Sequence, residues 1–103
     1  MSDRYDGKPF LRLLDSYVLS AIGALDQANE DWLTQSEPHF RHTFGEEGSW
    51  REIVASRMQF PEAMEASILE VWQKGRINFL WDSGAEPDAV QFTHTFVDTN
   101  FPH

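Results

Sequence analysis

The fold is decided by residues 9–26, PFLRLLDSYVLSAIGALD. When successive residues are placed 100° apart, as in an α-helix, the apolar side chains fill about half of the helical wheel and the polar side chains fill the rest. Leu19 is the one large apolar residue on the polar side. Pro9 suits the first turn of a helix, where a residue without an N–H is tolerated. An apolar arc this wide predicts a central helix that contacts two or more neighbours.

Helix signals continue from this stretch toward the C-terminus. Asn29 is placed to cap a helix that we expect from about residue 30 to residue 44, with Gly45 as its left-handed terminator. Pro38 lies inside this range, and a proline removes one hydrogen bond from a helix interior and crowds the carbonyl four residues earlier. The sequence therefore leaves two alternatives open for residues 30–44: one kinked helix, or two helices that separate near Ser36.

Two later helices have clear starting signals. Ser49 and Glu52 form a capping-box pattern, which predicts a helix that begins at residue 50 and ends before Pro61. A last helix is expected from about residue 88 to residue 99, directly after Pro87.

Between them, a longer helix is expected from about residue 62 to residue 82, closed by Gly84. Its apolar residues recur at helical spacing along one stripe. Gly75 lies within that stripe, although a glycine in a helix interior costs up to about 1 kcal/mol relative to alanine. We therefore expect another helix to cross close to Gly75. The members of the stripe are Met64, Ile68, Val71, Trp72, Gly75 and Phe79.

These signals predict an all-α fold, a compact bundle of four or five helices around a central amphipathic first helix. No segment alternates between apolar and polar residues for long enough to predict a strand. The 103 residues are expected to form a single domain, 1–103, because no linker or repeat divides them. Residues 1–8 are expected to form a flexible N-terminal segment.

The composition narrows the classes of function. With 17 acidic and 8 basic residues the formal net charge is −9, so nucleic acid and anionic membrane surfaces are unfavourable partners. The chain has no cysteine, which excludes disulfides, thiol catalysis and cysteine-based metal sites. No apolar run approaches the roughly 20 residues that span a bilayer, and the N-terminus lacks the pattern of a secretion signal. We expect a cytoplasmic protein without a cofactor, a membrane or a direct nucleic-acid partner.

His39, His42 and Glu46 are the strongest metal-ligand pattern in the chain. They fall within about 60° on a helical wheel, and a histidine pair with a carboxylate can supply three ligands. The pattern is incomplete, because Gly45 ends the helix before Glu46 and no second histidine and carboxylate motif accompanies it. We predict no metal site and interpret His42 as a residue of the last helical turn, where a cation is favoured.

His94 and Asp98 are spaced i, i+4, as a general base and the residue that orients it would be on one helix. Catalysis also requires a nucleophile, and no nucleophile motif surrounds any serine of the chain. We interpret the two residues as an exposed helical pair. The sequence therefore predicts no catalytic residue.

Several large apolar residues lie off the main stripes of their helices. Tryptophan and phenylalanine that cannot reach the core are typical of protein interfaces. The alternative is that the chain ends fold over them. On the first interpretation we predict self-association through Leu19, Ile77 and Trp81.

Three strings, KPFLRLLDSYVLSAIGAL, GSWREIVASRMQFP and FVDTNF, resemble those of small uncharacterised bacterial all-helical proteins. The strings cover about half of the chain and consist of helix and capping patterns. The resemblance implies a bacterial helical domain and carries over no active-site residue.

Together these features predict a small protein-protein interaction or regulatory module that binds a protein partner or forms a homodimer. The first alternative is a metal-dependent or other small enzyme that uses His39, His42 and nearby carboxylates. The second alternative is an acidic mimic of nucleic acid, which would need its carboxylates in a regular array on one side; the sequence distributes them over every helix.

Overall fold

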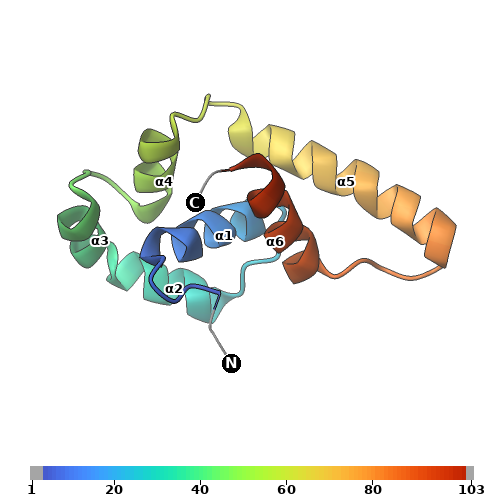
Figure 1. Ribbon diagram of the computed structural model, residues 1–103, viewed down its shortest axis with the longest axis horizontal. Helices are drawn as coiled ribbons and strands as arrows, with labels where there is room; N and C mark the ends of the chain where they lie inside the picture. The colour runs from blue at the N-terminus through green and yellow to red at the C-terminus, as the bar shows by residue number, and fades with distance from the viewer. Residues whose placement is uncertain (1–3, 102–103) are drawn as a thin grey trace.

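The computed structural model describes residues 4–101, which contain six α-helices and no strand. The predicted all-α class is confirmed (Figure 1). Four or five helices were predicted, and the described range has one more than the upper number because the predicted helix 30–44 is replaced by two helices. The helices are α1 Pro9–Ala21, α2 Gln27–Gln35, α3 Glu37–Phe44, α4 Trp50–Met58, α5 Met64–Ser83 and α6 Ala89–Asn100.

Helix α1 is the central element of the fold. It contacts α4, α5 and α6, and Figure 1 shows it in the middle of the molecule with the other helices around it. Seven of its 13 residues are buried. Its apolar side chains meet Trp50, Ile53 and Val54 of α4, Ile68 of α5 and Val97 of α6 in one core.

The C-terminus of α1 lies five residues before the predicted one, at Ala21 rather than residue 26. Gly23 adopts a left-handed conformation with φ +75°, which a glycine tolerates without strain. Its N–H donates to the carbonyl of Ser20, and the N–H of Ala24 donates to the carbonyl of Leu19. This pair of hydrogen bonds is the Schellman termination of a helix, so Gly23 ends α1.

The region around Pro38 settles the alternative that the sequence left open. Helix α2 ends at Gln35 and α3 begins at Glu37, with Ser36 between them and Pro38 in the first turn of α3. Proline is tolerated there because the first-turn N–H groups have no helical partner. The start of α2 also differs from the prediction: the N-cap is Asp26, whose side chain accepts from the Asn29 N–H.

The predicted capping box and the predicted terminator Gly84 agree with the structure, and Asp88 is a further cap that the sequence analysis did not name. Ser49 accepts a hydrogen bond from the Glu52 N–H, and the Glu52 side chain accepts from the Ser49 N–H, as the capping box requires. Helix α5 ends at Gly84, which is left-handed with φ +71°. Asp88 caps α6 by accepting from the N–H groups of Val90 and Gln91.

The N-terminal segment is held against two helices by Arg4. Its guanidinium binds both carboxylate oxygens of Asp15 on α1, at 2.7 and 3.0 Å, and both of Asp98 on α6, at 2.9 and 3.0 Å. Tyr5 packs against the core. A flexible segment was predicted for residues 1–8, and that prediction stays untested: residues 1–3 lie outside the described residues, and the contacts above concern Arg4 and Tyr5.

Helix α5 is the least buried of the long elements. Ile68 is its one buried residue among 20. Figure 1 shows α5 running along one edge, with its C-terminal end far from α1 and a loop that returns to α6. No helix within residues 4–101 combines the length and the apolar character needed to cross a membrane.

Candidate functional site

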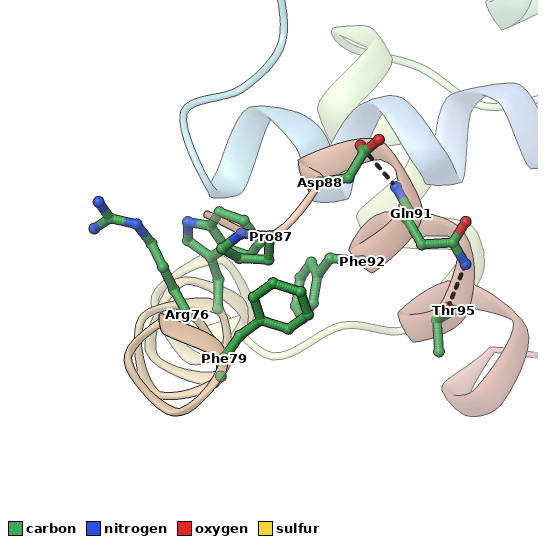
Figure 2. A pocket seen from close by; sticks show the side chains of 9 residues that line it. Arg76, Phe79, Pro87, Asp88, Gln91, Phe92 and Thr95 are labelled. Carbon is green, nitrogen blue, oxygen red and sulfur yellow. Dashed lines mark hydrogen bonds between the residues drawn. The ribbon is translucent and has the colours of Figure 1, made fainter. Parts of the chain in front are cut away.

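An apolar groove lies between the C-terminal half of α5 and the start of α6. It has a volume of about 350 Å³. Trp72 of α5 and Phe92 of α6 pack on each other in its lining, with ring centroids 5.0 Å apart and an interplanar angle of 57°. Phe79 lies across its opening and remains 46% exposed (Figure 2). The lining consists of Trp72, Gly75, Arg76, Phe79, Pro87, Asp88, Gln91, Phe92 and Thr95.

The polar side chains that line the groove already have hydrogen-bond partners. Arg76 donates to both carboxylate oxygens of Glu86 at 2.6 Å, and this hydrogen-bonded pair lowers the pKa of Glu86 and raises the pKa of Arg76. The Gln91 side chain donates to Thr95 on the α6 wall (Figure 2). The unpaired surface of the groove is therefore aromatic and apolar, which is the composition of a binding surface for apolar groups.

Gly75 lies in the groove wall, and the predicted close helix crossing there is absent among residues 4–101. A Cβ placed on Gly75 meets no atom within 4 Å. The prediction was wrong because α1 covers the first half of α5, around Ile68, while Gly75 lies two turns farther along the helix.

Of the three residues predicted to form an interface, Ile77 and Trp81 lie together and Leu19 lies apart from them. Ile77, Leu80 and Trp81 surround a shallow hollow on the outer side of α5, with Ile77 54% and Trp81 84% exposed. We call Ile77, Leu80 and Trp81 the outer stripe. Leu19 lies on α1 and is half-buried, and it does not line this hollow.

The weak metal candidates do not come together. Within residues 4–101 no group of three or more histidine or carboxylate side chains is arranged to hold a metal ion. The His39 ring lies 3.4 Å from the Thr43 hydroxyl, and the Glu46 carboxylate accepts from Ser56 on α4. Glu46 is separated from the two histidines because Gly45, with φ +66°, ends α3.

His94 has a different carboxylate neighbour from the one that its spacing suggests. Its Nε2 lies 3.6 Å from Asp15 Oδ2, whereas Asp98 binds Arg4. Asp15 is 1% exposed and already accepts two hydrogen bonds from Arg4. Tyr5 belongs to the same cluster through a hydrogen bond to Asp15. Burial, and then this hydrogen bond, raise the pKa of Tyr5 to about 12. We interpret this cluster as a structural joint between the N-terminal segment, α1 and α6.

Sequence reasoning missed the groove as a site. The apolar stripe of α5 was visible in the sequence, but a stripe does not reveal which part of it another element covers. Pro87 and Asp88, which start α6 and form the other wall, were visible as helix-start residues. Their position opposite Phe79 depends on the loop that returns from the end of α5.

Comparison with known proteins shows a partial similarity. Over 78 residues the chain is 27% identical to one subunit of the glutamyl-tRNA(Gln) amidotransferase of Bartonella henselae, and the match covers 76% of this chain and 16% of that protein. The chain therefore corresponds to about a sixth of the length of this relative. No family model and no solved structure matches the chain.

Proposed function

We propose that this chain is a protein-protein interaction module and that the outer stripe of α5 contacts its partner. The observation that carries the proposal is Trp81, which is 84% exposed at the end of a helix that projects from the body of the fold. Tryptophan is among the residues that contribute most binding energy at protein interfaces.

The surroundings of Trp81 support this proposal. Ile77 lies one helical turn away on the same side and is 54% exposed. Large apolar side chains gathered on a projecting element are typical of binding surfaces, whereas single exposed ones are ordinary. Trp32, by contrast, has the guanidinium of Arg12 at 4.1 Å from its ring centroid and an edge contact with Phe40. Trp32 is therefore partly covered by its own chain.

The module is proposed to act in the bacterial cytoplasm. The absence of cysteine and the net charge of −9 support this setting, and the partial relative is a bacterial protein. That relative is named as part of an enzyme, but the aligned stretch is 16% of its length. Amidotransferase activity is therefore not part of the proposal.

Site-specific photo-cross-linking in cells tests the proposal. A benzophenone amino acid replaces Trp81 in the full chain, produced at native level in its own host, and the adducts are separated by mass. We expect a defined adduct from position 81, and we expect Ile77→Glu in the same chain to abolish it. Burying a glutamate against an apolar partner is unfavourable, since the charge loses its water.

Val90 provides the matched control position. It is 49% exposed and apolar, and it lies on α6 rather than on the outer stripe. The same probe at position 90 should give no defined adduct. Absence of any adduct from position 81, or the same adducts from positions 81 and 90, would contradict the proposal.

A further inference from the structure

Only the first half of the apolar stripe of α5 is covered by this chain. Ile68, Trp72, Gly75 and Phe79 recur at spacings of three and four residues, so they lie along one side of the helix. Ile68 is fully buried in the core. Farther along, Trp72 is half-buried against the core, and together with Gly75 and Phe79 it lines the open groove. The same side of α5 is thus core in one half and surface in the other.

We propose that a second copy of this chain covers the open half, with the two α5 helices packed antiparallel about a twofold axis near Gly75. The outer stripe lies on the opposite side of α5, because two residues along a helix correspond to a rotation of about 200°. The inference therefore goes beyond the proposed function, and each copy keeps its outer stripe accessible.

The first argument is the open space at Gly75. A glycine in a helix interior is unfavourable relative to alanine, and it is explained when another backbone approaches closely. Within this chain no atom lies within 4 Å of a Cβ placed there. Gly75 therefore offers an open backbone position between the aromatic side chains of the groove wall.

The second argument is the symmetry of the exposed side chains around Gly75. Val71 lies four residues before it and Phe79 four residues after it, and they are 47% and 46% exposed. In an antiparallel pair centred on Gly75, Phe79 of each copy meets Val71 and the neighbouring Trp72 of the other. Such self-complementarity is what a twofold interface requires.

The third argument is charge. Residues 71–81 form the longest stretch of the chain without Asp or Glu, and they contain Lys74 and Arg76. Both cations are paired within the chain, Lys74 with Glu70 at 2.8 Å and Arg76 with Glu86 at 2.6 Å. Two molecules of net charge −9 repel each other least when they meet through such a segment.

Helix α5 supplies about half of the area that a small stable interface needs, and the facing wall of α6 must supply the rest. Stable interfaces at the small end of the range bury about 600 Å² per partner, which is about a tenth of the 6627 Å² surface of this chain. A 20-residue helix is about 30 Å long and about 10 Å wide, so one side of α5 presents on the order of 300 Å². The facing wall of α6, with Phe92 and Thr95, adds to it.

Sedimentation equilibrium on the full chain and three variants tests this inference. The unmodified chain is expected to dimerise in the micromolar range, and more tightly at higher salt because salt screens the repulsion between the copies. Phe79→Glu should weaken the dimer by a factor of about 30 or more. Gly75→Leu should weaken it by about fivefold or more, since the added side chain separates the helices.

Ile77→Glu is the matched control. It places the same charge on the same helix but on the opposite side, and its dimer should remain as tight as that of the unmodified chain. Both Phe79 and Ile77 are about half exposed, so neither change removes a buried side chain; circular dichroism on each variant establishes that the helices persist.

A single 11.9 kDa species at high micromolar concentration at both salt levels would overturn the inference. So would a dimer that Ile77→Glu disrupts while Phe79→Glu and Gly75→Leu leave it intact, which would place the contact on the outer stripe. The cross-linking experiment at position 81 can succeed or fail independently of these results, so failure of the dimer and failure of the proposed function are distinguishable.

Discussion

Helices α1 and α5 both carry apolar residues at helical spacing, but α1 is largely buried and α5 is largely exposed. α1 buries seven of its 13 residues, and α5 buries one of 20. The difference arises from their neighbours, because α1 is surrounded by α4, α5 and α6 while the end of α5 projects beyond them. Helical periodicity therefore identifies a side that prefers burial, but it does not identify the element that buries it.

The largest expected effect comes from shortening matched aliphatic side chains on the two helices. Leu14→Ala on α1 should lower the free energy of unfolding by about 2 to 5 kcal/mol, because Leu14 is fully buried. Ile77→Ala on α5 should change it by less than about 0.5 kcal/mol at concentrations where the chain is monomeric. Urea titrations followed by circular dichroism measure both. Equal losses would show that the end of α5 is as buried as α1.

Removing Arg4 tests how far the burial of α1 depends on the N-terminal segment. Arg4→Ala leaves the carboxylate of Asp15, which is 1% exposed, without its guanidinium partner. We expect a loss of about 2 kcal/mol, below the values for deeply buried pairs because Arg4 itself is 21% exposed and water can reach the carboxylate. The same urea titrations measure it. Asp15→Asn combined with Arg4→Ala should restore part of the loss, since no buried charge is then left unpaired.

Tyr5 makes the same joint sensitive to alkaline pH. Its pKa is raised from 10.0 to about 12 in the folded chain, chiefly by burial and then by its hydrogen bond to Asp15. A folded-state pKa above the unfolded value means that this contribution to stability is complete below pH 10 and is lost between about pH 10 and pH 12. Chemical unfolding across that range should show the decline. In Tyr5→Phe the decline should be reduced, with the remainder due to Tyr17, whose pKa burial also raises.

The smallest expected effect is a gain on α5. Gly75→Ala should raise the free energy of unfolding of the monomer by up to about 1 kcal/mol, because alanine favours the helix and nothing lies within 4 Å of the new Cβ. Thermal unfolding at low micromolar concentration measures it. Gly84→Ala is a useful contrast, since Gly84 is left-handed with φ +71° and alanine is strained there. A loss of stability in Gly75→Ala would indicate that a neighbour already occupies the space.

The parts of the fold that the sequence predicts are those specified by neighbouring residues. The capping box of Ser49 and Glu52 and the terminator Gly84 lie where the sequence places them, because caps depend on a few adjacent side chains. Where two nearby residues compete, as Asp26 and Asn29 do for one N-cap, the sequence does not decide between them.

Features that depend on distant residues were not predictable in this way. Arg4 and Asp98 are 94 positions apart, and no periodicity connects them. The spacing of His94 and Asp98 predicted a pair within one helix, whereas each residue contacts a charged group from outside α6. The groove was not predictable for the same reason. The apolar stripe of α5 was visible in the sequence, but the part of the stripe that stays open depends on where α6 returns against the body of the fold.

The joint formed by Arg4 also affects the order in which the molecule can be completed during synthesis. α1 leaves the ribosome before α6, which covers one side of it. Until α6 has emerged, one apolar side of α1 lacks its cover and Arg4 lacks Asp98. The central helix therefore stays incompletely buried until α6 has been synthesised, and closure of the core by α6 carries a high loop-closure cost because the two helices are far apart along the chain.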